Sequence, residues 1–218
     1  IINIKTPKLG DHVMAFRIPS EAYDPANEYP NWNHEWGGGL YKGIFTQQNK
    51  NFYPAFEKLF AQENIVRVLE IGTATGGFIR AVRDLTDAEI ITYDILETKH
   101  KATLEENNIS VNVKSVFDDF DAVEEYISGK GQVLVLCDGG DKRYEFHVFS
   151  KMLKSGDIIM AHDYSYDEAM YRAYIRENVW GWCQLQYKDI AFAVETQNLE
   201  PLMTEEFQEA AWTCWKKA

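Results

Sequence analysis

The sequence predicts an α/β fold with a mostly parallel sheet, an antiparallel C-terminal hairpin and helices on both faces of the sheet. The first observation is a series of short apolar segments, at 66–71, 90–94, 111–116, 133–137 and 157–161. The second is the helical patterns that separate them, at 77–84, 98–106, 119–128 and 143–154. Segments such as IVRVLEI and QVLVLCD are largely apolar rather than alternating, as a parallel sheet covered on both faces requires.

The segments outside this alternating region predict further elements. Residues 1–48 are expected to be irregular, because they contain four prolines and a run of three glycines. Apolar residues at helical spacing predict a helix over 49–61. The segment CQLQYKDIAFAVE predicts the antiparallel hairpin, with its turn at Lys188 and Asp189. Helices are expected before it, over about 166–179, and after it, over about 203–216.

Length and composition predict one soluble domain with an extension. The 218 residues suffice for a core without disulfides, and the alternating region predicts a domain over 63–218. Residues 1–62 are expected to form an N-terminal arm and helix. A net charge of −12 without a long basic block argues against nucleic acid or an anionic membrane as a partner. Three cysteines without a CxxC pair and no apolar segment of membrane-spanning length favour a cytoplasmic protein.

The most informative stretch is VLEIGTATGG, residues 68–77, where a buried strand ends and a glycine turn follows. Glycine lets the backbone approach a ligand closely, and ligands of open α/β sheets bind beyond the carboxyl ends of the strands. The glycine spacing matches neither the dinucleotide pattern G-x-G-x-x-G nor the phosphate loop that ends in GK[ST]. The turn therefore predicts a binding site for a ligand without a diphosphate.

Two carboxylates beside this turn narrow the choice of ligand. Glu70 accepts hydrogen bonds but donates none when ionised, so it suits an ammonium group or hydroxyls. Asp94 ends the second strand, where an acid can accept hydrogen bonds from both ribose hydroxyls. Taken alone, Asp94 could instead be a helix N-cap. Together these residues indicate a nucleoside that carries an amino-acid-like cation and no phosphate.

Acidic residues also follow the fourth and fifth predicted strands. Asp138 ends one strand, and His162 and Asp163 end the next, so parallel pairing would bring the three together. Carboxylate oxygens with water suit Mg²⁺, and the imidazole would also accept Mn²⁺, Fe²⁺ or Zn²⁺. Separately, Asp138 could cap the Gly139–Gly140 turn, and the other two could form a hydrogen-bonded pair. The convergence of all three favours a divalent metal, with Mg²⁺ as the preferred ion.

These stretches resemble the class I S-adenosylmethionine-dependent methyltransferases. VLEIGTATGG and ITYD match the first two motifs of that family, and LVLCDGGDKRYEF and SGDIIMAHDY match its fourth and fifth strand ends. The DGG and AHDY pieces, with the upstream WNHEWGG, are most similar to the metal-dependent small-molecule O-methyltransferases. That branch includes cephalosporin-hydroxylase, rhamnosyl and macrolide-sugar O-methyltransferase relatives. The resemblance covers about residues 30–195.

The resemblance implies a Rossmann-like methyltransferase fold and a role for each matching residue. The methionine part of S-adenosylmethionine would be held by Glu70, Gly72, Thr73 and Gly76. Asp94 would hold the ribose, and Phe117 and Asp118 would flank the adenine. The metal ligands would be Asp138, His162 and Asp163, although relatives often have an acid or amide where His162 stands.

The implied reaction is methyl transfer to an oxygen of a hydroxylated small molecule, such as a sugar or a natural product, assisted by the metal. Asp138 would act through the metal, which lowers the pKa of the substrate hydroxyl. The general base is predicted to be Asp141, at the position where sugar-methylating relatives commonly have histidine. Lys142 is expected to be solvated or paired with an acid. His34 and Trp36 are predicted to contact the substrate.

Several alternatives remain open. The N-terminal arm is expected to be either a substrate lid or a contact between subunits of a homo-oligomer. A hydroxylase like the cephalosporin relatives would need iron held by two histidines and a carboxylate, and the sequence offers one histidine at this position. A non-catalytic nucleoside-binding protein on the same fold is a third interpretation. The chain begins with Ile1 rather than methionine, so we expect it to be trimmed there.

Overall fold

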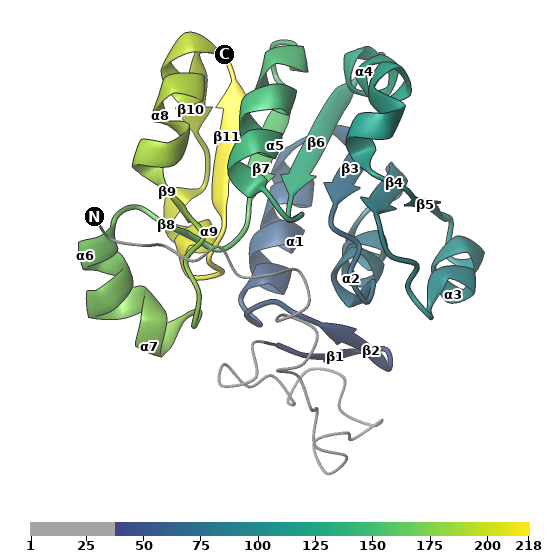
Figure 1. Cartoon of the computed structure of the whole chain (residues 1–218), viewed down its shortest axis with the longest axis horizontal. Coiled ribbons are helices and arrows are strands. Elements are labelled where there is room, and N and C mark those ends of the chain that lie inside the picture. Colours follow the sequence, from purple (N-terminus) through teal and green to yellow (C-terminus); the bar gives the residue numbers. More distant parts are fainter. Residues whose placement is uncertain (1–37) are drawn as a thin grey trace.

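The protein is built around one seven-stranded sheet, seen in a computed structural model that describes residues 38–218 (Figure 1). The strand order is β10-β11-β7-β6-β3-β4-β5. Five neighbouring strands, β7 to β5 in this order, run parallel, and β11 and β10 add an antiparallel edge. The strands are β3 (Ile65–Ile71), β4 (Glu89–Asp94), β5 (Ile109–Val113), β6 (Gln132–Cys137), β7 (Ile158–Ala161), β10 (Leu199–Pro201) and β11 (Thr213–Lys217). The predicted mostly parallel sheet is confirmed.

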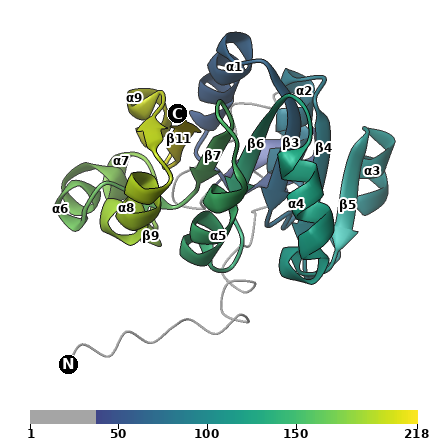
Figure 2. The same ribbon diagram turned by 90° about the horizontal axis from the view of Figure 1, so that it is seen from above.

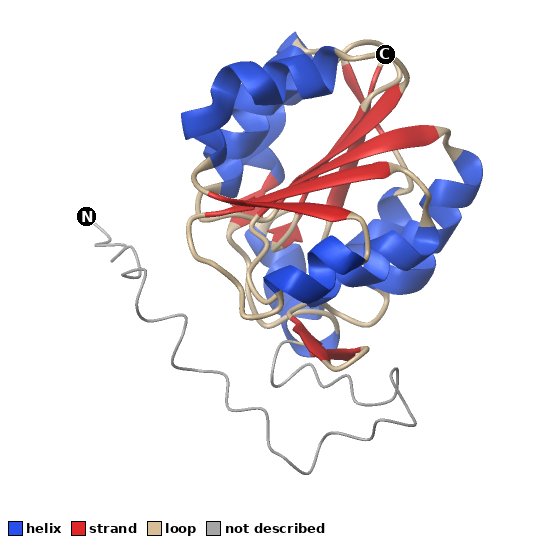
Figure 3. Ribbon diagram, turned by 90° about the vertical axis from the view of Figure 1, so that its right-hand side faces the viewer, coloured by secondary structure: helices blue, strands red, loops and turns tan. Residues whose placement is uncertain are grey.

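Helices cover both faces of this sheet (Figures 2 and 3). One face packs against α1 (Phe52–Gln62), α2 (Gly77–Leu85), α3 (Lys101–Glu106) and α9 (Thr204–Gln208). The other packs against α4 (Phe120–Ser128), α5 (Lys142–Phe149) and α8 (Tyr187–Thr196). Successive side chains of a strand point to opposite faces, so Val68 of β3 joins the first core and Leu69 the second. This double burial explains why the strand segments are apolar at nearly every position.

Short elements lie around the carboxyl ends of the parallel strands. A hairpin of β1 (Gly39–Tyr41) and β2 (Ile44–Thr46) contacts α2. A short helical segment runs through α6 (Glu168–Met170), a π-helical turn (Tyr171–Ile175) and α7 (Arg176–Asn178), close to the expected helix over 166–179. Strand β8 (Tyr164–Ser165) pairs with β9 (Leu185–Gln186), and a 3₁₀ turn at Val116–Asp119 follows β5. A second 3₁₀ turn, Ser150–Met152, follows α5 and leads into β7 at the opposite end of the strands.

Three predictions about the ends of the chain were wrong. The expected hairpin around Lys188 and Asp189 is mostly the helix α8, which begins with a capping box between Gln186 and Asp189. The antiparallel edge exists, but β10 and β11 form it. The expected helix over 203–216 stops at Gln208 and gives way to strand β11. Residues 39–46, expected to be irregular, form the β1–β2 hairpin.

Within residues 38–218, no helix combines the length and the apolar character that crossing a bilayer demands.

Candidate functional site

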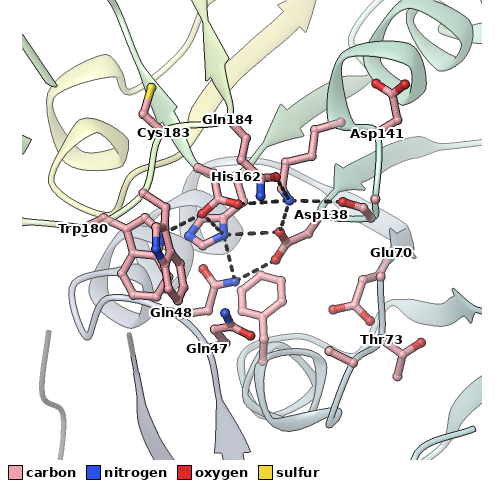
Figure 4. A pocket seen from close by; sticks show the side chains of 18 of the residues that line it. Gln47, Gln48, Glu70, Thr73, Asp138, Asp141, His162, Trp180, Cys183 and Gln184 are labelled. Carbon is pink, nitrogen blue, oxygen red and sulfur yellow. Dashed lines mark hydrogen bonds and ion pairs between the residues drawn. The ribbon is translucent and has the colours of Figure 1, made fainter. Parts of the chain in front are cut away.

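A cavity of about 1010 Å³ opens beyond the carboxyl ends of the parallel strands (Figure 4). Its walls come from the glycine turn after β3, the ends of β6 and β7, and the segment between α7 and β9. Its polar lining includes Gln48, Glu70, Asp138, Asp141, Lys142, His162, Asp163 and Gln184. This position is where open α/β sheets bind their ligands.

The glycine turn brings β3 and β6 into close contact at the edge of the cavity. Gly72 has φ +96°, and a Cβ atom there would lie 2.2 Å from the backbone oxygen of Asp138. The Asp138 N–H also donates to the Ile71 carbonyl, at 2.9 Å. Gly76, at φ +91°, precedes the first residue of α2. Glycine at 72 is therefore required by the close approach of the protein's own backbone, which places Glu70 and Asp138 on the same edge.

Glu70 lines the cavity but is almost fully buried, with 1% of its surface exposed. Burial raises the pKa of its carboxyl well above the usual range, and the negative charges of Asp138 and Asp94 raise it further. A hydrogen bond from Thr92 Oγ1 opposes this rise only in part. A cationic ligand beside Glu70 would favour the ionised carboxylate, so the site suits the ammonium group expected from the sequence.

The residues expected to bind ribose and adenine do not line the cavity. The Asp94 carboxylate accepts from the backbone N–H groups of Ala74, at 2.8 Å, and Leu96, at 2.9 Å. It is therefore tied to the glycine turn rather than acting as the N-cap of α3. Phe117 stacks on Phe149, with ring centroids 5.6 Å apart. Asp118, in the same 3₁₀ turn, and Gly76 also lie outside the lining. The cofactor-binding roles of Asp94, Phe117 and Asp118 stay predictions.

The predicted meeting of Asp138, His162 and Asp163 is confirmed. One ligand atom from each lies within 4.8 Å of the others. His162 Nδ1 lies 3.2 Å from Asp138 Oδ1 and 3.4 Å from Asp163 Oδ1. Its ring contacts those of Trp180 and Trp212, with centroid distances of 5.1 and 4.9 Å. The parallel pairing of β6 and β7 produces this cluster, because it sets the two strand ends side by side.

Lys142, in the first turn of α5, lies inside this cluster. Its side chain is 7% exposed, and Nζ lies 3.0 Å from Asp163 Oδ2 and 3.3 Å from Asp138 Oδ1. Nζ also donates to Gln184 Oε1, at 2.9 Å, and to the Gly139 carbonyl, at 3.1 Å. Burial alone would lower the pKa of Lys142, but the charges of Asp163 and Asp138 outweigh it and raise the pKa above its ordinary value. Of the two expectations for Lys142, pairing with acids is correct.

The remaining carboxylate oxygens accept from other N–H groups of the chain. Gln48 Nε2 donates to Asp138 Oδ2 at 2.8 Å, and Trp180 Nε1 donates to Asp163 Oδ1 at 2.5 Å. Burial would raise the pKa of Asp163, yet the charges of Lys142 and His162 and the hydrogen bonds from Lys142 and Trp180 lower it instead. Every oxygen of the two carboxylates thus has a nitrogen partner within the protein.

This arrangement does not fit a divalent metal among the expected ligands. Four oxygen atoms surround Lys142 Nζ at 2.9 to 3.3 Å, the lengths of N–H···O hydrogen bonds. Oxygen ligands lie at about 2.0–2.1 Å from Mg²⁺. A metal at the centre of the cluster would have to displace the ammonium, whereas the donors from Gln48 and Trp180 occupy only some of the carboxylate lone pairs. The ligand set is assembled as predicted, but its interior is occupied by a side chain of the protein.

Asp141, the predicted general base, lies apart from this cluster in Figure 4. It lines the cavity, but its Oδ1 accepts from the Tyr144 N–H at 3.0 Å and caps α5. The role of Asp141 as the general base stays a prediction. His34 and Trp36 fall outside the described residues.

Sequence reasoning missed several residues of the site. Gln48 holds Asp138, and its own Oε1 accepts from Trp212 Nε1 at 2.8 Å. Tyr171, Trp180 and Trp182 form an aromatic wall of the cavity. The sequence contains a signal for this wall, because in VWGWC, residues 179–183, two tryptophans flank a glycine after the fifth predicted strand. No comparable pattern marked Gln48, which depends on the unforeseen β1–β2 hairpin.

Comparison of the sequence finds no matching protein-family model and no matching curated protein. Comparison of the structure finds solved methyltransferases. A structure of CmcI described with Mg and SAM has a TM-score of 0.59 at 14% identity, and the match covers 100% of this chain and 88% of that one. A CmcI structure described with SAH gives 0.53 at 13% identity, covering 100% and 96% of the two chains.

A third similar structure is an O-methyltransferase family protein from Burkholderia thailandensis, with a TM-score of 0.50 at 11% identity. That match covers 77% of this chain and 55% of the other, so this chain spans about half the length of that relative. At these identities the likeness concerns the fold. The chain therefore has the Rossmann-like fold of the S-adenosylmethionine-dependent methyltransferases.

Proposed function

We propose that this protein is an S-adenosylmethionine-dependent methyltransferase that acts on an oxygen of a hydroxylated small molecule. The observation that supports this proposal best is Glu70. It is a buried carboxyl that lines the cavity and forms no ion pair with a basic side chain within residues 38–218. Such a group is unfavourable when ionised unless a ligand brings a positive charge to it. The methionine part of S-adenosylmethionine carries an ammonium group.

The surroundings of Glu70 support the same ligand. Gly72, Thr73 and Ala74 also line the cavity, and the turn has no phosphate-binding pattern. The structures of CmcI were described with SAM and SAH, and they share this fold. When bound, S-adenosylmethionine supplies a methyl group on a positively charged sulfur atom.

The acceptor would occupy the part of the cavity between the acidic cluster and the aromatic wall. Trp180, Trp182 and Tyr171 offer flat faces for packing a sugar or an aromatic ring and for excluding water. In the transfer, the bond from sulfur to the methyl carbon breaks and a bond to the acceptor oxygen forms. The hydroxyl proton must then pass to a base, for which Asp141 is the first choice and Asp138 the second. No step is assigned to a metal, because two of the three expected ligands, Asp138 and Asp163, contact the ammonium of Lys142.

The first prediction tests this proposal through Glu70. Glu70→Gln should weaken the binding of S-adenosylmethionine by about 10- to 100-fold, because a hydrogen bond to a charged group contributes about 1.5–3 kcal/mol. Glu63→Gln is the matched control, since Glu63 pairs with Lys216 and does not line the cavity. Calorimetry measures both. Because the pKa of Glu70 is raised, binding should also release protons, which calorimetry in two buffers of different ionisation enthalpy detects.

Two results would count against the proposed function. No binding of S-adenosylmethionine or S-adenosylhomocysteine at millimolar concentration would remove the cofactor. Binding without transfer to any of a panel of sugars, phenols and polyols, followed with a labelled methyl group, would favour the non-catalytic interpretation. Iron-dependent consumption of oxygen would favour the hydroxylase.

A further inference from the structure

Lys142 stands where the sequence predicts a metal ion, and its environment is that of a bound cation. Both carboxylates of the cluster contact its ammonium group. Its other two neighbours are also oxygen atoms, the Gly139 carbonyl oxygen and Gln184 Oε1. Hard cations prefer such an all-oxygen environment. The site differs from a metal site in its distances, because the oxygen atoms lie at hydrogen-bonding distance from the Lys142 nitrogen rather than at the shorter distance of metal ligands.

The position of the ammonium is fixed from several sides. Lys142 belongs to the first turn of α5, four residues after Asp138, so the helix start sets where its side chain emerges. An ammonium group has three N–H donors, and four oxygen atoms surround it here. The carboxylates are held in turn by Gln48 and Trp180. The ammonium and both carboxylates therefore have their partners within the protein, whereas the buried His162 Nε2 has no hydrogen-bond partner within residues 38–218.

We propose that the Lys142 ammonium replaces the divalent metal as the resident cation of this site. It neutralises part of the negative charge of Asp138 and Asp163 and keeps both carboxylates in place. The proposal predicts how tightly the protein and its Lys142 variants bind a divalent metal, which can be measured without any methyl transfer. The consequence for the reaction rests on the proposed function: the transfer would need no metal, and its acceptor would need no pair of neighbouring hydroxyls.

The acceptor needs no pair of hydroxyls because a divalent metal and an ammonium differ in how many free positions they offer to substrate oxygens. A divalent ion held by three protein ligands keeps open positions at which two substrate oxygens can chelate. The ammonium has its donors engaged by protein oxygen atoms, so it offers no chelation. Packing against the aromatic wall and single hydrogen bonds would select the acceptor. An acceptor with one hydroxyl should then react about as well as its vicinal diol analogue.

The experiment measures Mn²⁺ binding to the full chain, stripped with EDTA, by electron paramagnetic resonance. Wild type should bind Mn²⁺ only weakly. Lys142→Met leaves two carboxylates and an imidazole around an empty position, and should bind it roughly tenfold more tightly or better. Adding Asp163→Asn to that variant should abolish the gain. Lys154→Met is the matched control, because Lys154 pairs with the buried Asp157 outside the cavity, and it should gain nothing.

Wild-type binding as tight as that of Lys142→Met would overturn the proposal, and so would the absence of binding in both proteins. If Lys142→Met does not fold, Lys142→Gln takes its place, since it keeps a donor and loses the charge. The wild type alone also decides: micromolar binding of Mn²⁺ would show that Lys142 gives way to metal. Loss of activity with EDTA would separately contradict metal-free transfer, whereas a failure to bind S-adenosylmethionine affects only the proposed function.

Discussion

Glu145 is a buried carboxyl of α5 that supports the loop between β6 and this helix. Its oxygens accept from the backbone N–H groups of Gly139, at 3.2 Å, and Asp141, at 3.3 Å. Burial raises the pKa of Glu145 to about 7, although the charge of Lys142 and these hydrogen bonds oppose the rise. The carboxyl of the unfolded chain, at 4.5, loses its proton at lower pH. The folded state therefore holds the extra proton between these two values.

This difference predicts how stability depends on pH. Because the folded pKa is the higher one, the contribution of Glu145 is complete below pH 4.5 and declines as the pH rises to 7. The shift corresponds to roughly 3 kcal/mol of unfolding free energy. Urea unfolding at pH 5 and pH 8 should show that Glu145→Gln loses less stability than wild type over this interval. Equal losses in the two proteins would refute the assignment.

At the same scale, sequence analysis could predict some site residues and not others. Asp138 and Asp163 were predictable, because each follows a strand and the carboxyl ends of parallel strands meet at one edge of a sheet. The burial of Lys142 was not, because it depends on the residue at which α5 begins and on the rotation of that helix. Asp141 and Lys142 are neighbours, yet one caps the helix in solvent and the other lies in the acidic cluster.

Among the elements, the glycine turn between β3 and α2 provides a sharp prediction. Gly72→Ala should destabilise the protein by about 2–4 kcal/mol, because φ is positive and the new Cβ would collide with the Asp138 backbone. Gly140→Ala is the matched control, since nothing lies within 4 Å of a Cβ there. Thermal and urea unfolding measure both variants. Similar stability of the two variants would mean that the backbone after β3 does not approach Asp138 as closely as the structure indicates.

The elements also show where periodicity is informative. The parallel strands were predictable because they are buried on both faces, and their apolar segments contrast with the amphipathic helices between them. The segment YKDIAFAVE was ambiguous, because it is short and its apolar residues suit either a strand or a helix. The capping box of Gln186 and Asp189 favours the helix, and Ile190, Ala193 and Val194 are its buried face. The signal for α8 was thus present at the cap rather than in the apolar pattern.

Across the whole molecule, the site depends on segments far apart in the chain. Gln48 follows β2, Asp138 ends β6, and Trp212 precedes β11. Trp212 Nε1 donates to Gln48 Oε1 across 164 residues, and Gln48 Nε2 donates to Asp138 across 90. The division of the chain at 62 and 63 stays a prediction. Helix α1, before that boundary, contacts α2 and α9 after it.

This three-residue network predicts that the folding of the whole chain and the integrity of the site are linked. Gln48→Leu should lower the free energy of unfolding by about 1–3 kcal/mol, because it leaves the buried Trp212 N–H without its acceptor and removes a donor from Asp138. Gln197→Leu is the matched control, since within residues 38–218 the side chain of Gln197 makes a single 3.5 Å contact, with Thr196 on the surface. Urea unfolding, followed by tryptophan fluorescence, measures both. If Gln48→Leu were as stable as the control, Gln48 would hold Asp138 without supporting the fold, and only its effect on activity would remain to be explained.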